Sequence, residues 1–156
     1  MKLSVLTYPI LVALSGCSGS HKLDSSSDFQ VQFSSRSAIQ SYEVAITITT
    51  DELRLSFNNV ARGNIFNQSY TLQKPDREAL YEYLRSVDFL SLKSPKADLL
   101  VDAPQTSISA SYDGRSNTIE FGRVQNLPDT IAALRKKIFD VASKYNKEWQ
   151  KKVGFE

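Results

Sequence analysis

Four acidic residues of this chain are candidates for acid–base catalysis, because a carboxyl group can donate or accept a proton. Asp98 and Asp102 lie four residues apart in a segment that reads as a loop, whereas Asp113 and Glu120 lie in a turn and in the strand expected after it. Glycan hydrolysis uses two carboxyl groups about 5–9.5 Å apart. These four residues are therefore the candidates for a carboxylate-dependent glycan hydrolase.

Metal binding and other kinds of catalysis find little support in the residue spacing. The loop acids have no third carboxylate, no Gly-containing calcium-loop spacing and no histidine beside them, so we expect Asp98 and Asp102 to be solvated or to cap a helix or turn. His21, the only histidine, lies in a Ser-rich stretch with no second ligand near it. No Gly-x-Ser-x-Gly or phosphate-loop motif occurs. We therefore expect no catalytic residue, no metal and no cofactor, and a protein that is not an enzyme.

The remaining reactive side chain is Cys17, the only cysteine of the chain. A single thiol in an exported protein needs an explanation, because it has no intramolecular partner. Lys2 and the apolar run from Leu3 to Leu14 form the charged and apolar regions of a secretory signal peptide. This apolar run is shorter than the ~20 apolar residues that span a bilayer. Cys17 lies at the boundary between the apolar run and the polar segment that follows it.

The four residues Leu14-Ser15-Gly16-Cys17 resemble the lipobox of bacterial lipoproteins. The resemblance implies that residues 1–16 are a signal peptide, and that Cys17 carries diacylglycerol and palmitate. Each buried methylene contributes ~0.8 kcal/mol, and stable anchoring takes about two acyl chains. Ser18, rather than an aspartate, follows the cysteine, which in this family implies the outer membrane. We expect an outer-membrane, lipid-anchored protein whose domain lies in the periplasm.

The charge balance argues against a nucleic-acid partner. The chain has 19 Lys and Arg against 17 Asp and Glu, a net charge of +2; removal of Lys2 with residues 1–16 leaves 18 against 17, or +1. No basic and aromatic motif accompanies this small excess. The expected partners are the lipid bilayer, through acylated Cys17, and an envelope protein or peptidoglycan.

The rest of the chain divides into a tether and one domain. Residues 17–28 are polar and Ser-rich, and such a linker spans only ~18 Å on average. Residues 29–156 have the length of a single domain. Alternating apolar residues and two helical stripes predict an α+β fold, with an antiparallel sheet of about five strands built from two hairpins and two amphipathic helices on one face.

The first hairpin is predicted from the alternation of Tyr42–Thr49. A two-residue loop at Thr50-Asp51 would place Ile48 opposite Leu53 and keep all large apolar residues on one face. Residues 29–33 alternate in the same way, residues 34–40 break the pattern, and an irregular strand is expected between Ile65 and Leu72.

The second hairpin turns at Asp113-Gly114, a favoured two-residue pair, and places Tyr112 opposite Arg115. Its polar face consists of Ser107, Ser109, Ser111, Ser116, Thr118 and Glu120. We expect this face to be solvated, although a row of hydroxyls can also bind sugars, ice or another strand.

Two helices are predicted from proline and acidic start signals. The first begins at Lys74-Pro75-Asp76 and the second at Pro128-Asp129-Thr130. The apolar stripes expected to face the sheet are Ala79, Leu80, Tyr83, Leu84 and Val87 in the first helix, and Ile131, Leu134, Ile138, Val141 and Tyr145 in the second. Trp149 and Phe155 follow in a polar tail, where such aromatic residues require a place to pack.

Residues 41–145 also resemble small exported α+β domains of bacterial lipoproteins whose function is unknown. The residues that carry this resemblance are Ser41-Tyr42-Glu43-Val44, Phe89-Leu90-Ser91-Leu92, Asp102 and Leu127-Pro128. The resemblance implies a fold and a location but no reaction.

Three functions are compatible with these features. The first is a membrane-anchored, periplasm-facing lipoprotein with a non-catalytic binding or envelope-assembly role. The second is an inhibitor of an exported enzyme that presents a loop, either residues 93–104 or residues 58–67. The third is the glycan hydrolase that uses the acidic residues named above.

Overall fold

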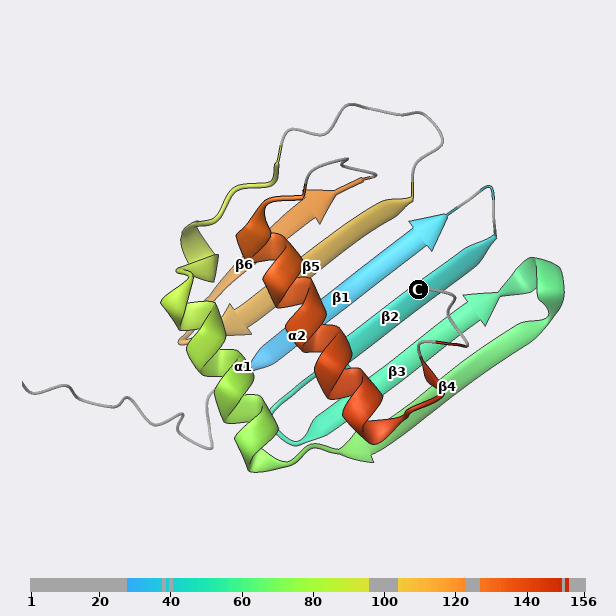
Figure 1. The fold of residues 1–156 in the computed structure, drawn as a ribbon, viewed down its shortest axis with the longest axis horizontal. Helices are drawn as coiled ribbons and strands as arrows, with labels where there is room; N and C mark the ends of the chain where they lie inside the picture. The colour runs from blue at the N-terminus through green and yellow to red at the C-terminus, as the bar shows by residue number, and fades with distance from the viewer. Residues whose placement is uncertain are drawn as a thin grey trace, which may run out of the picture.

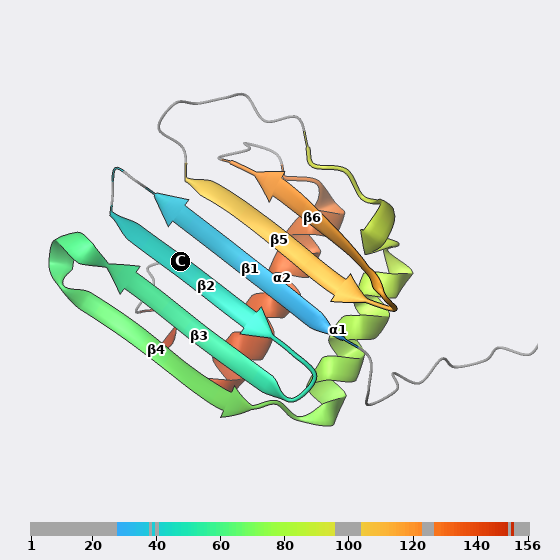
Figure 2. The same cartoon turned by 180° about the vertical axis from the view of Figure 1, so that it is seen from behind.

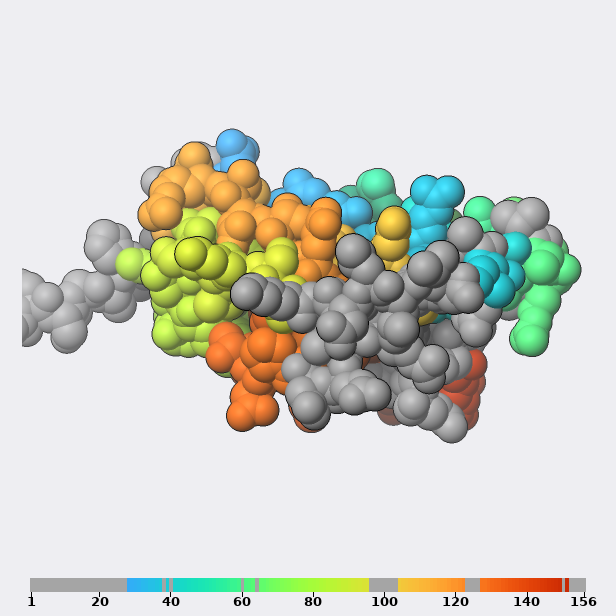
Figure 3. Space-filling model, turned by 90° about the horizontal axis from the view of Figure 1, so that it is seen from above, coloured from blue at the N-terminus to red at the C-terminus, as the bar shows by residue number. Residues whose placement is uncertain are grey.

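The computed structural model describes residues 28–37, 39, 41–95, 104–122, 127–149 and 151. These residues form two layers, a six-stranded antiparallel sheet and two helices that pack on one face of it (Figure 1). Figure 3 shows the layers from the side, with the strands above and α2 below. The predicted α+β fold is confirmed, but the sheet has six strands rather than about five.

The described chain forms six strands and two helices, and all neighbouring strands in the sheet are antiparallel. The strands are β1 (Gln30–Ser37), β2 (Tyr42–Ile48), β3 (Glu52–Asn59), β4 (Asn64–Thr71), β5 (Gln105–Tyr112) and β6 (Arg115–Phe121). The helices are α1 (Lys74–Ser86) and α2 (Asp129–Tyr145), with short 3-10 turns η1 (Val60–Arg62) and η2 (Phe89–Ser91). The strand order in space is β4-β3-β2-β1-β5-β6, so that β4 and β6 are the two edges.

Both hairpins have the predicted register. Ile48 lies opposite Leu53, and Tyr112 lies opposite Arg115. Asp113 and Gly114 have φ of 53° and 68°, the left-handed backbone that this turn requires.

The turn at Thr50-Asp51 has no residue in the left-handed conformation, and side chains stabilise it instead. The Thr49 hydroxyl accepts a hydrogen bond from the Glu52 N–H (3.2 Å), and Arg77 Nη1 donates to the Thr50 carbonyl (2.8 Å). A turn sequence without the favoured residues is therefore stabilised by contacts from outside the hairpin.

Strand β1 is longer than predicted, because it continues through residues 34–37, where the sequence pattern breaks. Ser35 and Ser37 point to the helix side and are only 1% and 5% exposed. The Ser35 hydroxyl lies 3.1 Å from the Thr106 hydroxyl of β5, within hydrogen-bond distance, and this contact offsets the cost of burying a polar group. Strand β4 is also regular over eight residues, which brings the count to six.

The helices bury slightly different faces from those predicted. In α1, Ala79 is exposed, and Tyr81 is buried in its place together with Leu80, Leu84 and the side chain of Arg77. The reason is aromatic packing, because Tyr81 makes edge contacts with the rings of Phe29 (6.1 Å) and Tyr112 (5.7 Å).

In α2, the predicted residues Ile131, Leu134 and Ile138 are buried against the sheet. Phe139 is buried too and makes an edge contact with the Phe33 ring (5.0 Å). None of the helices in the described part of the chain is both long and apolar enough to cross a membrane.

The second face of the sheet carries no helix in the described part of the chain (Figure 2). Its side chains are mainly hydroxyls and amides, and the few charges include the surface ion pair of Arg54 with Glu52 (3.1 Å). The residues of this face, from the register of the strands, include Gln32, Ser34, Thr47, Ser56, Asn67, Ser69, Ser107, Ser109, Ser111, Ser116 and Thr118. The polar face predicted for the second hairpin thus extends across all six strands.

Candidate functional site

The structure does not bring the described candidate carboxylates together. Asp98 and Asp102 lie outside the described residues, as do Cys17 and His21. Asp113 lies in the turn before β6 and Glu120 lies near the far end of that strand, and five residues of strand alone span ~17 Å. A glycan hydrolase needs ~5–9.5 Å between its carboxyl groups, so these two do not form such a pair.

Asp113 has a structural partner instead. Its carboxylate accepts a hydrogen bond from the Tyr81 hydroxyl, with distances of 2.9 and 3.1 Å to the two oxygens. Burial, and then this bond, raise the pKa of Tyr81 above its ordinary value. The contact joins α1 to the turn between β5 and β6. No three His, Cys, Asp or Glu residues of the described chain lie close enough to hold a metal.

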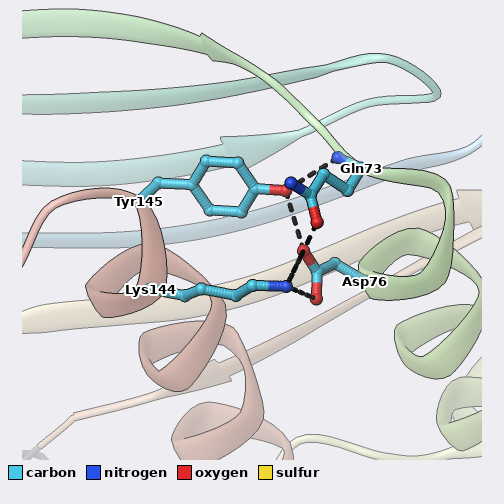
Figure 4. Close-up of polar contacts among 4 residues, drawn as sticks. All are labelled: Gln73, Asp76, Lys144 and Tyr145. Carbon is cyan, nitrogen blue, oxygen red and sulfur yellow. Dashed lines mark hydrogen bonds and ion pairs between the residues drawn. The ribbon is translucent and has the colours of Figure 1, made fainter.

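A second cluster of titratable groups lies where the end of α2 meets the start of α1 (Figure 4). The Tyr145 hydroxyl donates to Asp76 Oδ2 (2.7 Å) and accepts from the Gln73 N–H (2.7 Å). Lys144 Nζ lies 2.8 Å from both carboxylate oxygens of Asp76. Asp76 is in the first turn of α1, where an acidic residue also favours the helix dipole.

The electrostatics of this cluster suit a clamp better than a catalyst. Burial raises the pKa of Tyr145, and the bond to Asp76 raises it further. The bond to Asp76 also raises the pKa of Lys144. A catalytic acid or base is most effective when its pKa lies near the working pH, and these shifts move both pKa values further above neutrality. Because the Tyr145 hydroxyl both donates and accepts within the cluster, its role here is to join the two helices.

The residues that follow this clamp pack against edge strand β4. Asn146 Nδ2 donates to Gln68 Oε1 (3.2 Å) and to the Tyr70 hydroxyl (2.9 Å). Trp149 is fully buried and its ring centre lies 5.4 Å from that of Phe66. The predicted packing of Trp149 is therefore confirmed, while Phe155 lies outside the described residues. These contacts hold β4 firmly on its helix side.

The other side of the β4 backbone faces away from the sheet. The Leu72 N–H donates to the Asp51 carbonyl (2.8 Å), and backbone groups of an antiparallel strand alternate in direction. It follows that the backbone N–H and C=O groups of Phe66, Gln68 and Tyr70 form hydrogen bonds with β3. The backbone N–H and C=O groups of the residues between and beside them point outward, namely those of Ile65, Asn67, Ser69 and Thr71. Among the described residues, no backbone partner outside β3 is found for these four, and both ribbon views show β4 uncovered (Figures 1 and 2).

At the opposite edge of the sheet, formed by β6, outward backbone groups are hydrogen-bonded by side chains. On β6 the outward N–H groups of Thr118 and Glu120 donate to Asn117 Oδ1 and Ser94 Oγ, each at 2.9 Å. Asn117 Nδ2 also donates to the carbonyls of Phe89 and Leu92 (2.8 and 2.9 Å), which fixes residues 89–92 beside the strand. Side chains and a neighbouring segment therefore protect the β6 edge, which is how proteins prevent unwanted strand pairing.

The sequence of β4 contains none of the residues that usually protect an edge. It is Asn-Ile-Phe-Asn-Gln-Ser-Tyr-Thr, without charge or proline. Ile65, near the start of the strand, is 76% exposed and is the more exposed of the two large apolar residues that face solvent in the described chain. The open backbone edge from Ile65 to Thr71, here called the β4 edge, is the candidate interaction site.

The sequence predicted neither the β4 edge nor its position. The alternation of this strand is weak, and an edge is defined by which strands pair at long range. The missing charges and prolines between Ile65 and Leu72 were the available signal.

The two loops considered for an inhibitor differ in structure from simple loops. Residues 58–67 comprise the end of β3, η1 and the first half of β4. Of residues 93–104, the structure describes residues 93–95, which follow η2, and Pro104. The first segment is therefore mostly strand and belongs to the same edge of the sheet.

Among the described residues, the polar sheet face has a shallow depression of about 160 Å³, lined by Gln30, Ser109, Ser111, Ser116 and Thr118 among others. Pockets for drug-sized ligands are usually ~300–1,000 Å³. This depression is therefore too small for such a ligand.

Comparisons with known proteins leave the class of the protein open. No protein-family model matches the chain, and no curated protein sequence matches it significantly. The resemblance to lipoprotein domains stays a prediction from the residues that carry it.

Proposed function

We propose that this chain is a membrane-anchored, periplasm-facing lipoprotein with a non-catalytic role in envelope assembly, and that it binds through the β4 edge. The anchor is the lipid expected on Cys17, and the partner is an envelope protein that contributes a β-strand. Strand addition of this kind derives its affinity from main-chain hydrogen bonds and its specificity from the alternate side chains.

The difference between the two sheet edges carries this proposal. On β6, two outward N–H groups are bonded by side chains, whereas on β4 four consecutive outward positions have no such partner in the described chain. On the helix side of the sheet, Asn146 and Trp149 contact side chains of β4 and stabilise the position of this strand. A rigid edge loses little conformational entropy when a strand adds to it.

Crosslinking in intact cells tests the proposal. A photoreactive amino acid at Asn67, on the β4 edge, is expected to trap a specific envelope protein. The same residue at Lys136, which is exposed on α2, is the control and should trap none. Equal products from both positions, or none from position 67, would overturn the proposal.

A matched set of variants connects the crosslink to the backbone edge. Ser69→Pro removes an outward N–H, at a position where an edge strand tolerates proline, and should abolish the crosslink from position 67. Ser69→Ala keeps the N–H and Ser116→Pro makes the same change on β6, so both should retain it. Mass spectrometry of the wild type beside Cys17→Ala checks the anchor separately, since only the wild type should gain the mass of the acyl groups.

A further inference from the structure

We infer that the strand added to the β4 edge is β4 of a second copy of this chain, paired antiparallel about a two-fold axis. The inference rests on the proposed use of the β4 edge and names its partner. It predicts a dimer in which two six-stranded sheets join into one continuous sheet.

One register pairs every outward backbone group of β4 with its own counterpart. If Ile65 lies opposite Thr71 of the second copy, then Asn67 lies opposite Ser69, and the two-fold axis repeats both pairs. Residues with outward N–H and C=O groups then meet only residues of the same kind, as a hydrogen-bonded antiparallel ladder requires. No outward group between Ile65 and Thr71 remains without a partner.

The same register also matches side chains. On the helix side, Phe66 lies opposite Tyr70 of the second copy, and Gln68 lies opposite its own counterpart on the axis. Phe66 and Tyr70 are both half-buried in the single chain, and aromatic pairs across neighbouring strands are stabilising. On the polar side, Thr71 of the second copy comes beside Ile65, which is 76% exposed in the single chain.

The lack of charge on β4 allows it to pair with a second copy of itself. Antiparallel self-pairing brings like residues close together, so that a strand with charges of one sign repels itself. Strand β4 has no charged residue, and the whole chain has a net charge of only +2. No repulsion therefore opposes the pairing.

Disulfide trapping tests the register. In the full chain carrying Cys17→Ser, Gln68→Cys provides the only thiol. Directly opposed residues of a non-hydrogen-bonded pair have Cα atoms about 4.5 Å apart, which is within the about 4.4–6.8 Å that a disulfide bridges. Mild oxidation is expected to give a covalent dimer in high yield.

The matched control is Thr71→Cys in the same background. Both positions are exposed on β4, but in the proposed register two copies of residue 71 are six residues apart along the ladder, or ~20 Å. Thr71→Cys should therefore give at least tenfold less covalent dimer. Equal trapping at the two positions would overturn the register, because random collision would explain it.

Sedimentation equilibrium of the Cys17→Ser full chain measures the association without a trap. A concentration-dependent dimer is expected, and Ser69→Pro should abolish it while Ser69→Ala and Ser116→Pro retain it. The fluorescence of Trp149, the only tryptophan, reports whether each variant is folded.

The failure of this inference differs from the failure of the proposed function. A monomer at all concentrations, with the crosslink from position 67 to another envelope protein still lost in Ser69→Pro, would overturn the self-pairing and support the proposed function. A monomer with no crosslink from position 67 would overturn both.

Discussion

The Tyr145 hydroxyl donates a 2.7 Å hydrogen bond to Asp76 Oδ2 and thereby joins the last turn of α2 to the first turn of α1. We predict that Tyr145→Phe lowers the free energy of unfolding by about 1.5–3 kcal/mol, the typical cost of losing a hydrogen bond to a charged group. The ring remains and keeps its contact with Tyr70. Urea denaturation followed by Trp149 fluorescence measures the loss.

Lys144→Met is the control for this variant. It removes the ion pair with Asp76 (2.8 Å), but the lysine side chain is 52% exposed, and exposed pairs contribute about 0–1 kcal/mol. A loss in Lys144→Met as large as that in Tyr145→Phe would show that the charge of Lys144, rather than the Tyr145 hydroxyl, makes the clamp.

Stability should fall above about pH 10. The pKa values of Tyr81, Tyr112 and Tyr145 are raised mainly by burial, and that of Lys144 is raised mainly by its bond to Asp76. The unfolded chain therefore loses these protons first, so that stability is complete below the unfolded pKa values and decreases as pH rises through the folded ones.

Denaturation midpoints measured from pH 8 upward check this, and Tyr145→Phe should make the alkaline decrease shallower. An unchanged slope in that variant would mean that Tyr145 titrates alike in the folded and unfolded chains.

Trp149 should be among the residues with the largest effect on stability. Its side chain is fully buried against Phe66, and Trp→Ala changes in cores cost about 3–5 kcal/mol. Trp149→Phe should cost much less, because Trp149 Nε1 has no hydrogen-bond partner in the described chain.

Thermal denaturation followed by circular dichroism compares the two variants. If Trp149→Phe lowered stability as much as Trp149→Ala, the main contribution of the indole would be a polar contact rather than the space that it fills. In the wild type, the tryptophan emission should shift to longer wavelength on unfolding.

Arg77 should stabilise the turn between β2 and β3. Its side chain is 8% exposed and Nη1 donates to the Thr50 carbonyl at 2.8 Å. We predict that Arg77→Ala costs about 2–4 kcal/mol, because it removes a charge-assisted hydrogen bond and leaves a cavity. Arg77→Lys should lie between wild type and alanine, since lysine lacks the planar fork of donors.

Hydrogen exchange at the Glu52 amide should also accelerate in Arg77→Ala, because this amide closes the turn by donating to the Thr49 hydroxyl. Unchanged exchange there, together with a large loss of stability, would place the effect in the core instead of the turn.

Local rules predicted the hairpins well because each depends on residues near one another in sequence. Asp113-Gly114 determines its own turn, and the alternation on both sides fixes the register. The first hairpin formed as predicted even though Thr50-Asp51 is a poor turn pair, since a shift by one residue would expose Ile48 and Leu53.

Long-range pairing could not be predicted in the same way. Strand β1 lies between the two hairpins, with Val31 opposite Ile48 on one side and opposite Ala110 on the other. The burial of Ser35 depends on Thr106, 71 residues away. The β4 edge exists because β1, and not β4, takes the central place, so local pattern carried little information about the candidate site.

The central position of β1 also has a mechanical consequence. The chain enters the fold at Phe29, directly before β1, which is bonded to β2 and β5 along its length. A pull on the preceding residues along the strand axis would load both ladders in shear, so that many hydrogen bonds must break together. A sideways pull on β4 would peel its single ladder one bond at a time. Forced unfolding depends on the barrier along the pulling direction, so tension transmitted through the proposed lipid anchor would act on a strand that is bonded on both sides.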